Sequence, residues 1–233
     1  ATWDKVNLNE NLEHDYEALA ARVTNDTKLV FVCNPNNPTG TLVDPVLVKQ
    51  FCEEVSKKVT VYVDEAYLEF LEPKHQLSMV DLVKKDYNVV VSKTFSKIYG
   101  LAGLRLGYVV AKPELISKMA RYNMSISNNQ PAVAAAKASL GDQDFIALCR
   151  RKNAEARGHL TSYLDKKGIR YGKSHTNFVF FEAKDNAAQV LTKLEERGIG
   201  IRIWDYDHRQ WYRVSMGTLE EMNLFTKAFD EIV

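Results

Sequence analysis

The sequence is poor in the residues that mark disulfide frameworks, collagen-like repeats and metal sites. Among 233 residues there are three cysteines, six prolines and eleven glycines. Cys33, Cys52 and Cys149 stand alone, without the paired spacing of a disulfide framework or a zinc site, and the five histidines are scattered. We therefore expect no metal site, and three reduced, buried thiols that pack as small hydrophobic side chains, as in a cytoplasmic protein.

An excess of charge of one sign and long hydrophobic runs are also absent. The 31 basic and 30 acidic side chains give a net charge of +1 with interleaved signs. We therefore expect no nucleic-acid partner, which would require a basic face. No apolar run approaches the roughly 20 residues of a membrane span. Residues 1–11 contain neither a charged leader nor an apolar segment, so a signal peptide is not expected. The 45% hydrophobic content indicates a globular protein of one large or two modest domains.

Short apolar runs alternate with amphipathic segments in the first half of the chain. Strands are predicted at 29–33, 59–63, 88–92 and 106–111, and a helix at 77–84. Another helix is expected to open at Asp44-Pro45, an N-cap acid followed by a proline. Its predicted buried stripe consists of Leu47, Val48, Phe51 and Val55. This alternation predicts an α/β fold whose largely parallel sheet is covered on both faces.

The composition changes near Asn128, where a second unit is expected to begin. Helices are predicted at 131–140, 142–167, 187–197 and 219–232, and strands at 177–182, 199–204 and 212–216. We predict two units. Residues 1–128 would form part of a large domain, and residues 129–233 the linker helices and a smaller α+β domain.

Three loops, at 34–40, 64–67 and 92–105, follow predicted strands, at the sheet edge where α/β proteins bind ligands. Asp64 ends an apolar strand, and a carboxylate there is poorly solvated unless it has a cationic partner. Lys97 lies among hydroxyls, glycines and an arginine, which suit a phosphate. Each residue alone could be an ordinary surface group. Together they suggest a pyridoxal cofactor, whose aldehyde needs a lysine and whose ring nitrogen needs an acid.

The motifs, in their order and spacing, resemble those of the fold type I pyridoxal-phosphate aminotransferases, and most closely the histidinol-phosphate aminotransferase group. They are Asn-Pro-Asn-Asn-Pro-Thr-Gly at 34–40, Asp-Glu-Ala-Tyr at 64–67, Ser-Lys-Thr-Phe-Ser-Lys at 92–97 leading into Gly-Leu-Arg-Leu-Gly-Tyr at 103–108, and Tyr-Arg-Val-Ser-Met-Gly at 212–217. The resemblance runs from about Leu8 to the carboxyl end. It implies pyridoxal 5′-phosphate as cofactor, a small-molecule amino donor, a 2-oxo acid acceptor and a homodimer.

The resemblance also implies roles in catalysis. Lys97 would form the internal aldimine and, once displaced by substrate, carry the proton between the substrate and cofactor carbons. Asp64 would keep the pyridinium nitrogen protonated. Tyr67 and Asn37 would hydrogen-bond the phenolic oxygen of the cofactor, although the Asn37 loop could be no more than a turn.

Further residues would bind the phosphate and the substrate. Thr94, Ser96 and Arg105 would hold the cofactor phosphate, as the resemblance implies. Arg213 would grip a substrate carboxylate through a bidentate fork, although an arginine on a strand could equally be a surface ion-pair residue. Arg202 could contact substrate or simply alternate outward on its strand.

The leading functional hypothesis is histidinol-phosphate:2-oxoglutarate amino transfer by a ping-pong cycle, a step of histidine biosynthesis. The alternatives within the fold are an aminotransferase for aromatic or other amino acids and a phospho-amino-acid decarboxylase, which spacing cannot separate. An alternative of another class is a non-catalytic, cofactor-sensing domain fused behind a DNA-binding head.

The sequence departs from the family pattern at its amino end. The lid segment, the arm that reaches a partner's site and the Gly-rich phosphate loop have no counterpart before Leu29. The chain therefore resembles the carboxyl-terminal part of the family chain. Without a phosphate loop and its helix N-terminus, we expect these 233 residues to bind cofactor weakly and to catalyse little.

Overall fold

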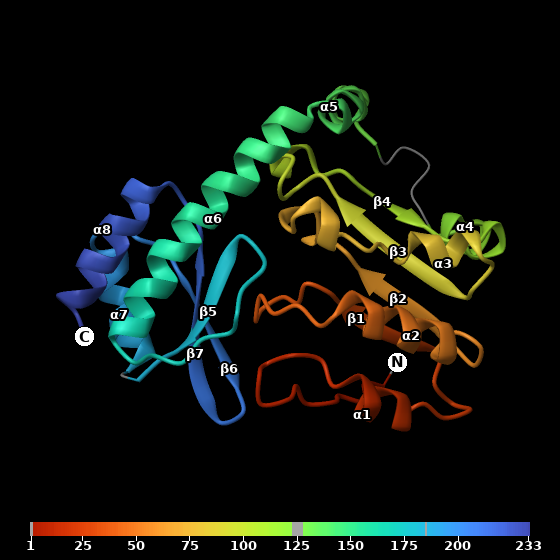
Figure 1. Cartoon of the computed structure of the whole chain (residues 1–233), viewed down its shortest axis with the longest axis horizontal. Coiled ribbons are helices and arrows are strands. Elements are labelled where there is room, and N and C mark those ends of the chain that lie inside the picture. The colour runs from red at the N-terminus through yellow and green to blue at the C-terminus, as the bar shows by residue number, and fades with distance from the viewer. Residues whose placement is uncertain (1, 123–127, 185) are drawn as a thin grey trace.

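Two sheets and the helices around them make up the structure, a computed structural model that describes residues 2–122, 128–184 and 186–233 (Figure 1). The first sheet has the order β1-β2-β3-β4, with β1 to β3 parallel and β4 antiparallel to β3. Its strands are β1 (Leu29–Cys33), β2 (Thr60–Asp64), β3 (Val89–Thr94) and β4 (Gly107–Val110). Its accompanying helices are α1 (Tyr16–Ala21), α2 (Pro45–Val55), α3 (Val80–Lys84) and α4 (Pro113–Ala120), with 3-10 turns at Leu68–Phe70, Pro73–His75 and Ala102–Leu104.

The second sheet is antiparallel, with the order β5-β7-β6. It consists of β5 (Phe178–Glu182), β6 (Arg202–Tyr206) and β7 (Arg209–Ser215). The helices of this part are α5 (Gln130–Gly141), α6 (Gln143–Lys166), α7 (Ala187–Glu195) and α8 (Leu219–Asp230). No helix of the described residues is long and apolar enough to cross a membrane.

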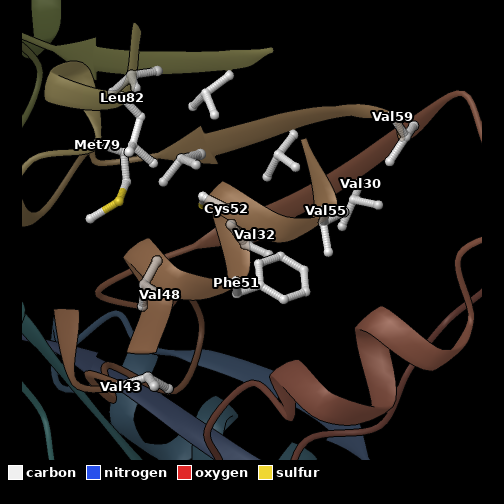
Figure 2. Packing of buried hydrophobic residues seen from close by; sticks show 14 residues of the cluster. Val30, Val32, Val43, Val48, Phe51, Cys52, Val55, Val59, Met79 and Leu82 are labelled. Carbon is white, nitrogen blue, oxygen red and sulfur yellow. The ribbon is translucent and has the colours of Figure 1, made fainter. Parts of the chain in front are cut away.

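The first core lies between the sheet and α2 and α3 (Figure 2). Val30 and Val32 of β1 point into it because alternate strand residues share a face. The opposite face of β1 carries Leu29 and Phe31, which are 51% and 49% exposed. Within the described residues, this face of β1 is therefore left open, whereas the prediction was a sheet covered on both faces.

Helix α2 begins where the sequence predicts, and the Asp44 carboxylate accepts a hydrogen bond from the Val46 amide at 2.9 Å. Its buried stripe differs from the prediction at one position. Leu47 is 53% exposed, and the fully buried Cys52 occupies the core instead. The reason is that the stripe recurs at spacings of three and four residues, which place 48, 51, 52 and 55 on one side. The prediction of three buried thiols is also wrong for Cys149, which is only partly buried.

Helix α6 connects the two sheets (Figure 1). Its later turns contribute Leu160 and Leu164 to the core of the second sheet. Ile146, near its beginning, packs in a separate cluster with Tyr67 of the first part and Phe178 of β5. One helix thus contacts both the segment after β2 and the second sheet, so it fixes the distance between them.

Candidate active site

The carboxyl ends of β1, β2 and β3 meet at one edge of the first sheet. In the register of the sheet Cys33 lies beside Asp64, and Asp64 beside Ser92. The three loops predicted to bind ligands therefore begin at neighbouring points. Asp64 accepts hydrogen bonds from Ser92 Oγ at 3.3 Å and from the Ala66 amide at 3.0 Å, both at Oδ1. Within the described part of the chain, these contacts leave its Oδ2 available to a donor on a ligand.

Tyr67 lies at the centre of this edge and is only 3% exposed. Its ring packs edge-on against Phe178, with centroids 5.3 Å apart, and Lys97 Nζ lies 5.4 Å from the ring centre. Burial raises the pKa of the Tyr67 phenol to about 12, although the charge of Arg213 opposes the rise. The hydroxyl is therefore protonated at neutral pH and can donate a hydrogen bond.

Arg213 reaches this edge from β7, in the other sheet. Its Nη1 donates to Asn37 Oδ1 at 2.8 Å, its guanidinium hydrogen-bonds Tyr67, and its Cζ lies 4.7 Å from the Phe178 ring centre. Its Nε is buried and has no hydrogen-bond partner among the residues that the structure describes. The guanidinium as a whole is only partly buried, but an unpaired buried Nε is costly, and a bidentate carboxylate would satisfy it.

Lys97 is half-buried beside this arginine. Burial lowers the pKa of its ammonium group, and the charges of Arg213 and Arg202 lower it further, whereas Asp64 opposes them. A lowered pKa means that more of the amine is neutral near pH 7. The neutral form is the nucleophile that attacks a carbonyl.

We expect the charge of Arg213 to be measurable at Lys97. Arg213→Met removes a positive neighbour, so the pKa of Lys97 rises and its reaction with a generic acylating reagent shifts to higher pH. Mass spectrometry of the acylated peptide against pH gives the midpoint, and acylation of the exposed Lys84 in the same samples is the internal reference. An unchanged or lower midpoint at Lys97 would contradict the arrangement described here.

Thr94 is the last residue of β3, and Ser96 and Arg105 lie on the segment that joins β3 to β4. Thr94 Oγ1 accepts a hydrogen bond from the Ser96 amide at 3.0 Å, which shapes the turn. Arg105 has a left-handed backbone (φ 53°) and donates from Nη1 to the Ala102 carbonyl at 2.9 Å. A non-glycine residue in that conformation is strained, a cost often found at binding sites. The structure thus places the three predicted phosphate ligands on one loop, with the arginine exposed.

Glycine is required where this loop rejoins the sheet. A Cβ on Gly107 would lie 2.8 Å from the Lys93 carbonyl oxygen, closer than carbon and oxygen can pack. Any larger residue would push β4 away from β3 beside the Lys97 loop.

Sequence reasoning missed several residues at this edge or left them open. Arg202, left open, lies near enough to act on the pKa of Lys97. Phe178 was missed because an aromatic residue on a strand usually indicates core packing. Glu65 and Lys93 form a buried ion pair at 3.0 Å directly behind the site. The sequence does contain a signal for that pair, because Glu65 follows Asp64 and Lys93 follows Ser92 at the ends of two neighbouring strands.

The fold and the site together identify a class of proteins, and the sequence comparison then identifies the family. A mostly parallel sheet with an acid, a buried tyrosine and an activated lysine at its carboxyl edge, joined to a smaller antiparallel sheet that supplies an arginine, is the fold type I architecture. The chain matches the family described as Aminotransferase class I and II over residues 1–229, and it belongs to that family.

Individual relatives agree with this assignment. The chain is 37% identical over 225 residues to the histidinol-phosphate aminotransferase of Moorella thermoacetica, covering 96% of this chain and 58% of the relative. It is 41% identical over 212 residues to histidinol-phosphate aminotransferase 2 of Ralstonia nicotianae, covering 89% and 57%. Histidinol-phosphate aminotransferase from Sinorhizobium meliloti, solved in complex with pyridoxal-5′-phosphate, superimposes with a TM-score of 0.88 at 30% identity, covering 98% and 63%. The chain therefore spans less than two thirds of the length of these relatives.

Proposed function

We propose that this chain carries the lysine-bearing and substrate-binding portion of a histidinol-phosphate:2-oxoglutarate aminotransferase that uses pyridoxal 5′-phosphate. The observation that carries the proposal is the meeting of Asp64, Tyr67 and Lys97 with Arg213, which comes from the other sheet. The names of the relatives support the choice of substrate.

The side chains at the site fit this cofactor. Asp64 has an oxygen free for a pyridinium N–H, Tyr67 and Asn37 can donate to a phenolic oxygen, and Lys97 has an amine with a lowered pKa. Thr94, Ser96 and Arg105 supply hydroxyl and guanidinium donors for a phosphate. When bound, pyridoxal 5′-phosphate supplies an aldehyde and an electron-accepting ring.

The protein's own groups then have defined tasks. With the cofactor bound, Lys97 Nζ would hold its aldehyde and, once released, would take the proton from the substrate α-carbon. Asp64 would stabilise a positive charge on the ring nitrogen. Arg213 offers its unpaired Nε and a terminal nitrogen to a substrate carboxylate, which orients the α-carbon toward Lys97.

The partners and organisation form part of the same proposal. The amino donor and the 2-oxo acid acceptor are small molecules, and the active protein is a homodimer in the cytoplasm. The free thiols of the three cysteines support a reducing compartment. We also retain the division into residues 1–128 and 129–233, of which residues 1, 123–127 and 185 lie outside the described residues. Since the relatives are longer than this chain, we expect the 233 residues alone to bind cofactor weakly and to turn over slowly.

Borohydride trapping tests the proposal. The chain is mixed with excess pyridoxal 5′-phosphate, reduced and digested, and we expect the modified peptide to carry the label at Lys97. A main label at any other lysine, including the neighbouring Lys93, would refute the assignment of the site.

A panel of amino donors tests the substrate. Single-turnover conversion of the cofactor to its amine form is followed with histidinol phosphate, tyrosine, phenylalanine and threonine phosphate, and histidinol phosphate is expected to react fastest. A faster reaction with an aromatic donor, or carbon dioxide release from threonine phosphate, would favour an alternative within the fold. Trapping at Lys97 without conversion of any donor would favour a cofactor-sensing domain.

A further inference from the structure

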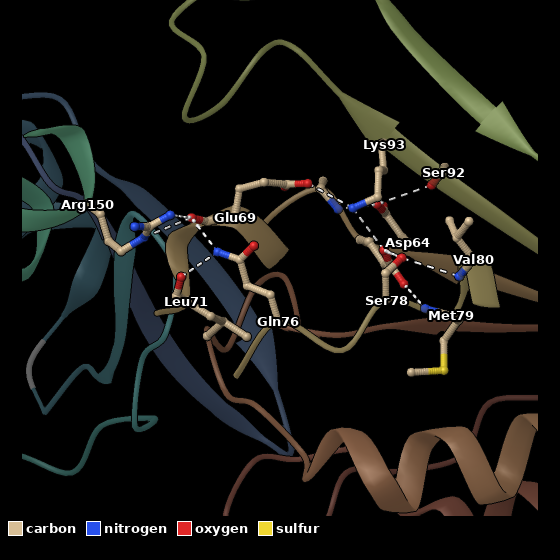
Figure 3. A network of polar contacts seen from close by, with 12 residues as sticks. Asp64, Glu69, Leu71, Gln76, Ser78, Met79, Val80, Ser92, Lys93 and Arg150 are labelled. Carbon is tan, nitrogen blue, oxygen red and sulfur yellow. Dashed lines mark hydrogen bonds and ion pairs between the residues drawn. The ribbon is translucent and has the colours of Figure 1, made fainter. Parts of the chain in front are cut away.

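A buried charged network lies directly behind the site (Figure 3). Lys93 Nζ contacts Glu65 Oε2 at 3.0 Å and Glu69 Oε1 at 2.8 Å. The three side chains are 12%, 3% and 17% exposed, so little water reaches them. Burial would lower the pKa of Lys93, but the two carboxylates outweigh it and raise the pKa above its usual value. The network therefore keeps its ammonium charge.

The network and the candidate site use successive residues at the ends of the same two strands, β2 and β3. Asp64 and Ser92 hydrogen-bond each other, and the next residues, Glu65 and Lys93, form the ion pair. Because successive residues of extended backbone point to opposite sides, the ion pair is the reverse side of the Asp64 contact. A displacement of Glu65 would be passed to Asp64 through one peptide bond.

The same network also contains residues on both sides of Tyr67 in the sequence. Glu65 precedes Tyr67 by two residues and Glu69 follows it by two. The Glu65 carboxylate also accepts hydrogen bonds from Ser78 Oγ and the Met79 amide, each at 2.6 Å. Lys93 thus ties both flanks of Tyr67 to β3.

Helix α6 adds an attachment from the second part of the chain. Arg150 donates from Nε and Nη2 to the Glu69 carbonyl, at 3.3 and 3.2 Å, and Gln76 Nε2 donates to the Leu71 carbonyl at 2.6 Å (Figure 3). The segment from Asp64 to Leu71 is thereby held at its side chains and at its backbone, from three different elements.

We propose that Lys93, through Glu65 and Glu69, is a positioning residue that fixes Asp64 and Tyr67 in the geometry needed at the active site. The expected effect of Lys93 on cofactor binding rests on the proposed function, whereas its expected effect on the segment from Asp64 to Leu71 does not. Removal of Lys93 leaves the buried Glu65 carboxylate and the partly buried Glu69 carboxylate without their cation, and their mutual repulsion and hydration move the segment.

The experiment compares Lys93→Met, Lys93→Arg and the control Lys84→Met in the complete 233-residue chain. Lys84 forms an exposed ion pair with Asp81, at 3.0 Å, so its loss removes a lysine ion pair that no residue of the network shares. The first readout is amide hydrogen exchange of the peptide covering residues 64–71, measured relative to a peptide from β5. We expect Lys93→Met to raise that ratio by about tenfold. We expect Lys93→Arg to raise it less and Lys84→Met to leave it unchanged.

The second readout is the bound cofactor. In Lys93→Met we expect the dissociation constant of pyridoxal 5′-phosphate to rise by about 10- to 100-fold, by analogy with the loss of a residue that holds a metal ligand in place. We also expect the pH midpoint of the visible absorbance of the bound cofactor to move. Uniformly faster exchange over the whole chain, with an unmoved absorbance midpoint, is the result of a merely structural role and would overturn the proposal.

Two further outcomes distinguish a failure of this proposal from a failure of the proposed function or of a variant to fold. If the unaltered chain shows no labelling at Lys97, the proposed function fails, and hydrogen exchange alone decides whether Lys93 positions the segment. If Lys93→Met does not fold, Glu69→Gln replaces it, since that variant keeps the Lys93–Glu65 pair and the carbonyl contact with Arg150. Unchanged exchange at residues 64–71 in Glu69→Gln would then overturn the proposal.

Discussion

Replacement of Lys97 by alanine is expected to lower the single-turnover rate of amino transfer by about 10⁴-fold, the upper range for loss of a positioned acid–base group. In the proposed function, the substitution removes both the amine that would bind the aldehyde and the base that would take the α-proton. Binding of the amine form of the cofactor should change by less than about tenfold, because the phosphate ligands and Asp64 remain in place. Rates are measured in rapid-mixing experiments with histidinol phosphate as the donor.

The matched control for this variant is Lys84→Ala, whose side chain is exposed and lies outside the site. Its rate should equal that of the unaltered chain. If Lys97→Ala retained more than about a tenth of the rate, another group would be the proton carrier and our assignment of Lys97 would be wrong.

Replacement of Asp64 by asparagine is expected to lower the same rate by about 10²- to 10³-fold, the usual cost of removing one preorganised electrostatic contact. The amide Oδ1 can still accept hydrogen bonds from Ser92 and the Ala66 amide, so the local fold should be preserved. What is lost is the negative charge that, in the proposed function, would keep the ring nitrogen protonated.

The Asp64 charge has a second, opposite signature at Lys97. Asp64 raises the pKa of Lys97, whereas Arg213 lowers it. Asp64→Asn should therefore move the pH midpoint of Lys97 acylation to lower pH, the reverse of the shift expected for Arg213→Met. Asp81→Asn, which alters an exposed carboxylate, should leave both the rate and the midpoint unchanged. A normal rate in Asp64→Asn would argue against a carboxylate contact to the ring.

The parts of the fold that could be predicted are those in which burial follows local periodicity. The strand at 29–33 was found with its predicted bounds, and the Asp44-Pro45 helix start was found at its predicted position. Helices α1 and α4 were not predicted: α1 has only six residues and none of them is buried, whereas α4 does carry an apolar stripe, with Leu115, Ile116 and Met119, which the prediction overlooked. Such short helices are stabilised by their context rather than by their own sequence.

The hairpin of the second sheet shows a different limit. The strand predicted at 199–204 is β6, which begins and ends later, and β7 begins three residues before the predicted 212. Asp207 and His208 make the turn between them, with φ values of 51° and 58°. Two-residue hairpins need such positive φ values, but they usually signal them with glycine or asparagine. An Asp-His turn gives no such signal. The strand was predicted too early in the sequence because Ile199 and Ile201 are apolar.

At the site, proximity could be predicted wherever it depended on parallel strand ends. Asp64, Tyr67 and Lys97 meet because their loops share one edge of the sheet. The placement of Arg213 at the site was predicted only from the family resemblance, since no local pattern links residues of different sheets, and its hydrogen bond to Asn37 was not predicted. The role of Lys93 could not be predicted, because a charged residue at a strand end is usually solvated, and only the structure shows two buried carboxylates around it.

The hydrogen bond between Arg213 and Asn37 joins residues 176 positions apart in sequence. Contacts of such separation form late in folding, because the entropy of closing a long loop must be overcome before they are made. During synthesis, Lys97 leaves the ribosome long before Arg213 does. Since the charge of Arg213 contributes to the lowered pKa of Lys97, that part of the lowering exists only once the second sheet has docked against the first. The reactivity of Lys97 is therefore coupled to the folding of both sheets and not to that of the first sheet alone.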